Sequence, residues 1–405
     1  MSRRELQELG KSRVSLTEVD MANTVRIGVI GMGNMGTAHA KSIIDGKVPG
    51  LELAAMADIR ATRRDWVQEN MSEYPWYDSA EDLIKKSDVD AVLIAVPHYE
   101  HVPLSILALE QGKHVLLEKP ISVQVSEARR LNAVADRAEH TFAIMFNQRT
   151  NPLYRRMRQM IMDGELGAIK RTNWIITTWY RTQSYYDSGD WRATWSGEGG
   201  GVLLNQCPHN LDLWQWICGM PNRVRAFCHV GKWHDIEVED DVTAYVEYPD
   251  GGTGVFVTST ADAPGTNRLE IVGDRGKMIC ENDQLRICRL KVDEREFCRT
   301  SQGFQQPEGE WEVIEMGDDN PQHIGILRNF TRHILAGEPL ISPGQEGINS
   351  LMLSNAMYLS SWLDKAVELP IDDELFDQHL KVKIAGSKRK VAVGSDTITD
   401  VKGSF

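Results

Sequence analysis

The chain has 405 residues, and its 45 Lys and Arg are outnumbered by 58 Asp and Glu, which gives a formal net charge of −13. This length predicts two domains, or three small ones, with ample buried core. A hydrophobic fraction of 41% and a mean hydropathy of −0.36 indicate an ordinary globular protein. Because the balance is acidic and no block of Lys or Arg occurs, the composition argues against nucleic acid and anionic membrane surfaces as general partners.

The six cysteines form no Cys-x-x-Cys pair, so we expect reduced thiols rather than a zinc site or a disulfide framework. Residues 1–24 mix charges of both signs without an apolar signal core, and no run approaches the roughly 20 apolar residues of a membrane span. A cytoplasmic location is therefore expected. We interpret residues 1–24 as a frayed extension, in preference to an arm that embraces a neighbouring subunit.

The first half of the chain alternates β-type and helical segments. Residues 25–30 predict a strand, 31–36 a glycine-rich turn and 37–45 a helix. Further strands are expected over 51–58, 91–97, 114–120 and 141–147, with helices over 60–70, 101–111 and 123–139. This alternation predicts an α/β domain over residues 25–148 with a doubly wound parallel sheet.

The rhythm changes after about residue 150. A helix over 152–162 leads into strand-rich sequence with hairpin signals at 248–252 and 273–276, followed by helical patterns over 321–336 and 343–366. We therefore expect a second, antiparallel α+β domain over 149–370. A polar tail is expected over 371–405.

The glycine-rich turn follows a strand and opens a helix, which is the context of a dinucleotide-binding loop. Its six residues are Gly31, Met32, Gly33, Asn34, Met35 and Gly36. Asp58 ends the next strand, where an acid accepts hydrogen bonds from the ribose hydroxyls, beside Ile59 and Arg60. The carboxylate would repel a 2′-phosphate and favours NAD, whereas Arg60 could contact that phosphate, so NADP is the weaker alternative. A glycine turn without any nucleotide is the other interpretation.

Two further segments carry chemistry. Glu118-Lys119-Pro120 ends a strand, and open α/β sheets bind ligands beyond their carboxyl edge, so Lys119 is expected to face the cofactor crevice. A helix that begins near residue 203 would place Asn205, His209 and Asp212 on one face, with His209 able to move a proton near neutral pH. A buried core histidine and a metal site are the alternatives; without more ligands we predict no metal.

Six of the eleven tryptophans lie between residues 174 and 216, together with Tyr180, Tyr185 and Tyr186. Aromatic rings of this kind can line a site for a sugar, whose C–H faces pack on them while its hydroxyls are hydrogen-bonded. Some of these rings must belong to the core.

Taken together, these features resemble the glucose-fructose oxidoreductase/inositol dehydrogenase/MocA family. The resemblance runs from residue 25 to about 221 and more weakly to about 370. Its carriers are VRIGVIGMGNMG, VLIAVPHYEHVPLSILALEQGKHVLLEKP, MFNQR, the pair Trp191-Arg192, and GGGVLLNQCPHNLDLWQWICGMP. It implies a Rossmann domain, a second domain with a large open, mostly antiparallel sheet often used for oligomerisation, and NAD(P)-linked chemistry at a carbinol carbon of sugars and cyclitols.

The resemblance also implies residue roles. Lys119 would hold the reacting hydroxyl and His209 would be the general base. The family usually has an acid four residues before this histidine, where this chain has Asn205; an amide cannot take a proton, so we interpret Asn205 as a substrate ligand. The substrate-binding residues are expected to be Asn205, Asp212, Arg149, Tyr180 and Trp191. Those expected at the cofactor, besides the loop and residues 58–60, are Val96, Pro97, His98, His101, Glu118, Lys119, Asn147, Trp191 and Arg192.

The expected reaction is hydride transfer between nicotinamide and a secondary alcohol carbon of a sugar, a glycoside or a cyclitol, with oxidation of a glycoside at C3 as one form. One alternative is a redox-neutral enzyme that oxidises a glycoside transiently, cleaves it by elimination and returns the hydride. Another is a sensor that binds dinucleotide without catalysis, which the presence of both Lys119 and His209 argues against. We expect a homo-oligomer, a dimer or tetramer, formed through the sheet of the second domain.

Overall fold

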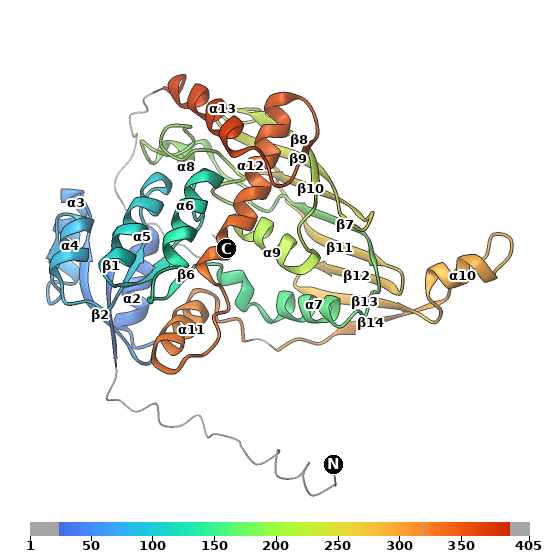
Figure 1. Ribbon diagram of the computed structural model, residues 1–405, viewed down its shortest axis with the longest axis horizontal. Helices are drawn as coiled ribbons and strands as arrows, with labels where there is room; N and C mark the ends of the chain where they lie inside the picture. Colours follow the sequence, from blue (N-terminus) through green and yellow to red (C-terminus); the bar gives the residue numbers. More distant parts are fainter. Residues whose placement is uncertain (1–23, 318, 389–405) are drawn as a thin grey trace, which may run out of the picture.

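The structure is a computed structural model that describes residues 24–317 and 319–388. The chain builds two β-sheets, with helices packed between and around them (Figure 1). Of the expected extension over residues 1–24, only residue 24 is among the described residues. The expected tail lies outside them from residue 389 on.

The first sheet has six strands in the order β3-β2-β1-β4-β5-β6, and all of its pairings are parallel. Its strands are β1 (Val25–Ile30), β2 (Leu51–Ala57), β3 (Trp76–Tyr77), β4 (Ala91–Ile94), β5 (His114–Leu117) and β6 (Phe142–Ile144). The helices between them are α2 (Asn34–Ile44), α3 (Ala61–Asn70), α4 (Ala80–Lys86), α5 (His101–Glu110) and α6 (Val125–Ala135). The doubly wound parallel sheet expected from the sequence is confirmed. Its central strands are almost entirely apolar, with Arg26 of β1 as the exception, because helices cover both faces.

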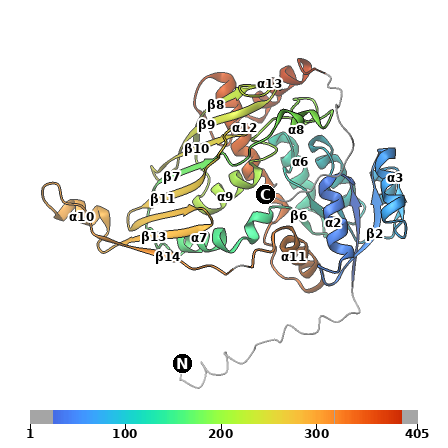
Figure 2. The ribbon, with the colours of Figure 1, turned by 180° about the vertical axis from the view of Figure 1, so that it is seen from behind.

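A helix from late in the chain completes the core of this first sheet. Helix α11 (Gln322–Ala336) buries Ile326, Leu327 and Phe330 in the cluster that also holds residues of β1. Figures 1 and 2 show α11 beside the first sheet, far from the strands that precede it in sequence. Residues after β14 therefore return to the first part of the molecule, and the division near residue 148 stays a prediction.

The second sheet has nine strands in the order β14-β13-β12-β11-β7-β10-β9-β8-β15. β10 and β7 pair in parallel, whereas the other pairings are antiparallel. The strands are β7 (Ile169–Ile176), β8 (Arg223–Val230), β9 (Glu239–Glu247), β10 (Thr253–Ser259), β11 (Asn267–Gly273), β12 (Gly276–Glu281), β13 (Gln284–Leu290), β14 (Gly309–Ile314) and β15 (Val367–Glu368). The expected hairpins at 248–252 and 273–276 join β9 to β10 and β11 to β12.

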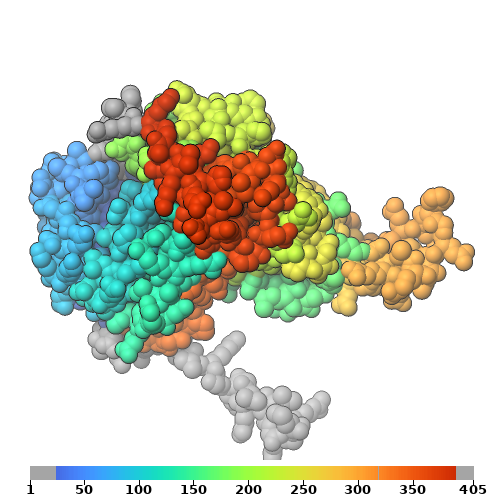
Figure 3. Space-filling model, turned by 45° about the horizontal axis from the view of Figure 1, so that its top comes forward, coloured from blue at the N-terminus to red at the C-terminus, as the bar shows by residue number. Residues whose placement is uncertain are grey.

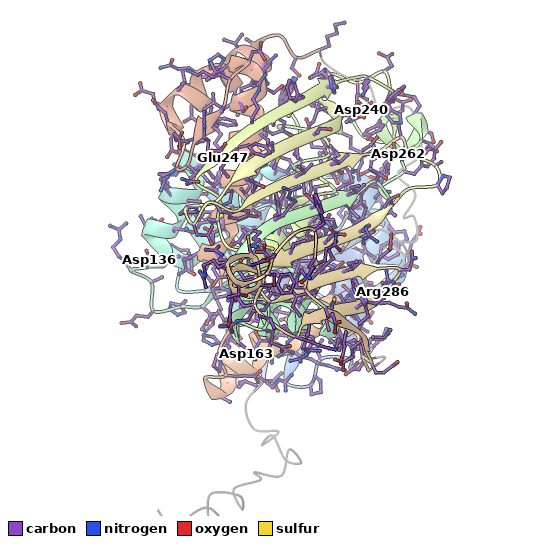
Figure 4. All side chains as sticks on the ribbon, turned by 90° about the vertical axis from the view of Figure 1, so that its right-hand side faces the viewer. Asp136, Asp163, Asp240, Glu247, Asp262 and Arg286 are labelled. Atoms are coloured by element: carbon purple, nitrogen blue, oxygen red, sulfur yellow. The ribbon has the colours of Figure 1, made fainter. Side chains whose placement is uncertain are left out.

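Helices cover one face of this sheet and leave the other open. Along β7, Trp174 and Ile176 are buried, whereas Ile175 is 40% exposed, as expected for a strand with one covered face. The covering helices include α7 (Pro152–Met162), α9 (Pro208–Cys218) and α12 (Gly347–Leu363). Figure 4 looks onto the open face, where Glu247 of β9 and Arg286 of β13 are labelled.

Helices α12 and α13 (Asp373–Ala385) join the two parts of the molecule. Both contact α6, and α12 also contacts β8 and α9. In the space-filling view these red-orange helices lie against both the cyan and the yellow-green segments (Figure 3). The tail expected from residue 371 is thus corrected in its first part, because α13 buries Phe376 and Leu380. An apolar pair one turn apart was the signal for this helix.

Shorter elements complete the chain. These are the single turns η1 (His98–Glu100), η2 (Asn147–Thr150) and η3 (Gly344–Glu346), and the helices α8 (Gln183–Asp187) and α10 (Glu294–Thr300). Helix α10 buries none of its residues and projects away from the sheet between β13 and β14 (Figure 2). Within the described residues, no helix is both long enough and apolar enough to cross a membrane.

Candidate active site

The glycine turn between β1 and α2 has the shape of an anion cradle. Gly31 has a φ of +91°, and a Cβ there would lie 2.4 Å from the carbonyl oxygen of Ala95. A Cβ on Gly36 would lie 1.8 Å from the carbonyl oxygen of Gly31, so only glycine allows α2 to approach the turn this closely. At Gly33 the nearest atom to such a Cβ would be Nη2 of Arg60, at 3.8 Å, which leaves backbone accessible to a ligand.

Gly33 is also the N-cap of α2 and offers no side chain to the first N–H groups of that helix. Backbone N–H groups at a helix start attract a pyrophosphate, and the helix dipole adds to this attraction. The loop therefore fits the diphosphate of a dinucleotide.

Asp58 follows β2 and is held against the glycine loop. Its Oδ2 accepts a hydrogen bond from the backbone N–H of Met32 at 2.8 Å, and its Oδ1 accepts one from that of Arg60 at 2.9 Å. The Arg60 guanidinium also pairs with this carboxylate, at 3.2 Å from Nε to Oδ1. The acid expected to receive the ribose hydroxyls thus lies beside the loop, with the competing arginine bound to it, whereas Ile59 is 85% exposed.

Lys119 follows β5, at the carboxyl edge of the first sheet. Its Nζ donates a hydrogen bond to the backbone carbonyl of Asn205 at 2.9 Å. Burial lowers the pKa of Lys119, while the carboxylates of Glu118 and Glu198 raise it. An ammonium group held this way keeps further N–H donors for a substrate hydroxyl.

Glu118, the residue before Lys119, forms hydrogen bonds that fix the position of this segment. Its Oε1 lies 2.7 Å from Nε2 of His39, and its Oε2 accepts from the backbone N–H of Lys119 at 3.2 Å. Burial raises the pKa of Glu118, but the hydrogen bond and charge of His39, with His323 and Lys119 nearby, bring it down to about 2. Glu118 is therefore an anion that pairs with its neighbours.

The segment before His209 corrects the expected helix. Helix α9 begins at Pro208 rather than near residue 203, so Asn205 lies in a preceding turn and does not share a helical face with His209. The buried carboxylate of Glu239, on β9, accepts hydrogen bonds from the backbone N–H groups of Gly201 and Leu203, both at 2.9 Å. These bonds fix the turn to β9. Pro208 has no N–H to donate to Leu204, as a helix that began near residue 203 would require, whereas it suits the first helical position.

His209 lies in the first turn of α9 and is 3% exposed. Its Nδ1 is buried and has no hydrogen-bond partner among the residues that the structure describes. Burial, then the charge of Lys119, hold the pKa of His209 well below its ordinary value, so the ring is neutral at physiological pH. A neutral imidazole near an ammonium group is competent to accept a proton.

Arg149 and Asp212, expected to bind substrate, instead bind each other. Arg149 donates from Nε to Oδ2 of Asp212 at 2.8 Å and from Nη2 to Oδ1 at 2.6 Å, and both residues are 0% exposed. Arg149 also pairs with Glu346 and donates to the carbonyl of Ile341 at 3.3 Å. The structure therefore corrects both assignments: this bidentate pair joins η2 to α9.

The histidines after β4 separate into two roles. His101 has both ring nitrogens on backbone carbonyls, Nδ1 at 2.7 Å from Pro120 and Nε2 at 2.9 Å from Val96, so we reassign it from the cofactor to bracing this turn. His98 places Nδ1 2.9 Å from the carbonyl oxygen of Glu198 and its ring edge-on to Trp191. The β4 loop, with its exposed Pro97, thereby contacts the second part of the chain.

Asn147 is fully buried after β6. Its Nδ2 donates to Oε1 of Gln322 at 2.6 Å, whereas its Oδ1 has no partner within the described ranges. Buried polar atoms nearly always have a hydrogen-bond partner, so an unpaired one points to a partner outside the chain, such as a water molecule or a ligand. The expectation that Asn147 contacts the cofactor is compatible with this geometry and stays a prediction.

The aromatic cluster is mostly core. Trp174, Trp179, Trp195 and Trp214 are at most 8% exposed, and Trp216 packs against the guanidinium groups of Arg149 and Arg158. Tyr180 is 50% exposed. These buried rings belong to the core, as expected for some of the cluster, and the expectation that others line a sugar site stays a prediction.

Some of the aromatic side chains remain beside Lys119. The Arg192 guanidinium stacks on Trp191 and on Tyr185, and its Nη1 donates to the Tyr185 hydroxyl at 3.0 Å. That hydroxyl also accepts from Nε2 of Gln206 at 3.2 Å. Gln206 was not expected at the site, and Tyr185 was expected there only as a member of the aromatic cluster.

Sequence reasoning also missed Glu198. This residue is 2% exposed and accepts a hydrogen bond from Nδ2 of Asn205. The available sequence signal was its position directly before three consecutive glycines. In the structure it has a partner, as expected for a buried acid. Within the described residues, no group of three or more His, Cys, Asp or Glu could hold a metal ion.

Two segments of the chain match models of known protein families. Residues 25–146 match the family model described as "Oxidoreductase family, NAD-binding Rossmann fold", and residues 154–279 match "GFO/IDH/MocA C-terminal domain". The chain is 25% identical over 355 residues to myo-inositol 2-dehydrogenase of Thermotoga maritima, covering 85% of this chain and 98% of that protein. It is 23% identical over 387 residues to levoglucosan dehydrogenase of Pseudarthrobacter phenanthrenivorans, covering 85% and 98%.

Among solved structures, the chain resembles the WlbA dehydrogenase from Chromobacterium violaceum, determined in complex with NADH and UDP-GlcNAcA. The TM-score is 0.72 at 25% identity, covering 86% of this chain and 97% of the other. The two family matches cover most of both domains. They agree with the anion cradle at the glycine turn and with the presence of two sheets. The chain therefore belongs to the GFO/IDH/MocA family of NAD-dependent oxidoreductases.

Proposed function

We propose that Lys119 and His209 move the hydroxyl proton while a secondary alcohol carbon of a sugar, a glycoside or a cyclitol is oxidised. The observation that carries this proposal is their placement. They are 90 positions apart in sequence, yet Nζ of Lys119 donates to the backbone carbonyl of Asn205, four residues before His209, at 2.9 Å. Ligands of open α/β sheets bind at the carboxyl edge of the sheet, where Lys119 lies.

Bound NAD supplies the nicotinamide carbon that accepts the hydride. The Lys119 ammonium donates a hydrogen bond to the substrate oxygen and stabilises the negative charge that grows on it. His209, neutral and buried, accepts the hydroxyl proton as the C–H bond breaks, and the alcohol carbon becomes a carbonyl. In the reverse direction protonated His209 returns the proton.

The relatives support this substrate class. Two of them are named as dehydrogenases of myo-inositol and levoglucosan, and the WlbA structure holds a nucleotide sugar acid with NADH. All three ligands carry secondary hydroxyl groups on a ring. We propose the same chemical class for this chain, without choosing the ring or the carbon.

The test follows NADH absorbance with NAD and a panel of cyclitols, anhydrosugars, free sugars, glycosides and nucleotide sugars. Lys119→Ala should lower the rate about 10²- to 10⁴-fold, the usual contribution of a positioned proton-transfer group, while NAD binding is retained. Undiminished sugar oxidation in Lys119→Ala would refute the assignment. Cleavage of a glycoside by purified enzyme without added NAD, and without net NADH, would instead favour the redox-neutral alternative.

We also propose that a second copy of the chain covers the open face of the nine-stranded sheet. Ile175 on β7, Val257 on β10 and Phe227 on β8 lie in one row across the sheet through the pairings of β9, and Ile175 and Phe227 are 40% and 49% exposed. An apolar row at the middle of a broad face favours burial against a partner. A two-fold axis would place this row against itself.

A further inference from the structure

The carboxylate of Glu198 is buried beside the proposed proton-transfer residues but contacts neither of them directly. One oxygen, Oε1, accepts from Nδ2 of Asn205, and the other, Oε2, accepts from the backbone N–H of Ala193 at 2.6 Å. With both oxygens occupied and 2% of the residue exposed, Glu198 is not placed to bind substrate.

Asn205 connects this carboxylate to Lys119. Its amide nitrogen donates to Glu198, and its backbone carbonyl accepts from Nζ of Lys119 at 2.9 Å. The side chain at position 205 is an uncharged amide. Asn205 therefore helps to orient Lys119 but supplies no negative charge to it.

Two cations and a phenol face Glu198. Lys119 and Arg192 both act on its charge, and the phenol of Tyr186 lies within its electrostatic reach. His98 contacts the backbone carbonyl of Glu198, at 2.9 Å from Nδ1, and its ring is neutral because burial lowers its pKa well below the ordinary value. Glu118 raises the pKa of Lys119 more than Glu198 does, and Arg192 and Arg181 lower it; Glu118 also pairs with His39, at 2.7 Å.

A buried ammonium group needs an anion nearby to stay charged, because burial favours its neutral form. We propose that Glu198 is a positioning residue for the reaction: it orients Asn205 toward Lys119 and, together with Glu118, supplies negative charge that keeps Lys119 protonated at working pH. This inference rests on the proposed function of Lys119.

Because Glu198 is buried, water screens its charge little, so the carboxylate can act on Lys119 over several ångströms. The same burial raises the pKa of Glu198, and Arg192, Ala193, Asn205 and Lys119 oppose that shift. Both carboxyl oxygens of Glu198 accept hydrogen bonds, from Ala193 and from Asn205, and these bonds favour the ionised form. A neutral amide at 198 would preserve the size of the side chain and remove the charge.

The experiment measures kcat against pH for wild type and Glu198→Gln with NAD and the best substrate of the panel. Removal of the anion lowers the pKa of Lys119, so we expect the basic limb of the profile to move to lower pH by roughly one unit. Restoring a carboxylate one hydrogen bond away, in the double variant Glu198→Gln with Asn205→Asp, should bring the limb back. A merely structural role would not move the limb or be rescued this way.

Glu237→Gln is the matched control. Glu237 is a carboxylate of a neighbouring loop that accepts from the backbone N–H groups of Trp195 and Lys388, both at 2.9 Å. Its removal should leave the basic limb in place. If Glu198→Gln fails to fold, Glu198→Asp keeps the charge and should keep the wild-type limb, whereas a one-unit shift in that variant overturns the proposal.

An unmoved limb in folded Glu198→Gln overturns the role of Glu198, as does a double variant that stays shifted. The proposed function fails by a different result, namely no substrate-dependent NADH in wild type or full activity in Lys119→Ala. The two failures are therefore distinguishable.

Discussion

The buried pair of Arg149 and Asp212 gives the sharpest test of the structure against the sequence-based expectation. In Asp212→Asn the side chain keeps its size, but the guanidinium loses the charge that accepts two of its hydrogen bonds, at 2.8 and 2.6 Å. Breaking a buried pair by removing one partner costs about 3–5 kcal/mol. Glu346 remains as a second carboxylate, with its side chain 42% exposed, so we expect the low end, about 3 kcal/mol.

The assay is urea unfolding followed by tryptophan fluorescence, with kcat and KM measured on the folded enzyme. A loss of about 3 kcal/mol is a large share of the 5–15 kcal/mol typical of a domain. KM should change little because Asp212 is 0% exposed. The control is Asp82→Asn, which removes a surface ion pair with Lys86 and should cost no more than about 0.5 kcal/mol.

Replacing both partners, in Arg149→Met with Asp212→Leu, should be milder than Asp212→Asn, because no unpaired charge then stays buried. The reasoning is refuted if Asp212→Asn unfolds like wild type while its KM rises tenfold or more. That result would return Asp212 to the substrate site.

Three further predictions follow from the cofactor loop, the base and the open sheet. Asp58→Ala removes the carboxylate that holds Arg60 and should raise kcat/KM for NADP relative to NAD about tenfold or more; an unchanged ratio means that another residue reads the ribose. Because burial and Lys119 lower the pKa of His209, the acidic limb of kcat/KM should lie below pH 6.5, and a limb above it contradicts His209 as the base. Ile175→Glu should lower the mass measured by light scattering, whereas Met162→Glu, exposed on α7, should not.

Much of the cofactor half was predictable because its signals are local. The strand, glycine turn and helix over 25–44 follow from adjacent residues: Gly31 and Gly36 leave no room for a Cβ in that turn, and Gly33 leaves its backbone accessible. The placement of Lys119 followed from a general rule about strand ends. Parallel strands buried on both faces also form short apolar runs in sequence, so five of the six strands of the first sheet were expected, whereas the two-residue β3 and the short helix α4 were missed.

Tertiary contacts decided the rest. The turn before α9 depends on Glu239 of β9, whose carboxylate accepts from the N–H groups of Gly201 and Leu203 and fixes this segment to the second sheet. Arg149 and Glu198 are polar residues whose partners lie 63 and 7 positions away, and spacing along the chain does not reveal such pairings.

The sequence by itself therefore determined the family, the parallel sheet, the dinucleotide cradle and two candidates for proton transfer. Only the tertiary structure decided which polar side chains face a ligand and which neutralise one another. The physical reason is that burial makes an unpaired charge costly, so each buried charge is paired by whichever group the fold brings near. Asp212 thus pairs with Arg149 and joins helix α9 to η2, and the Glu198 carboxylate accepts a hydrogen bond from Asn205.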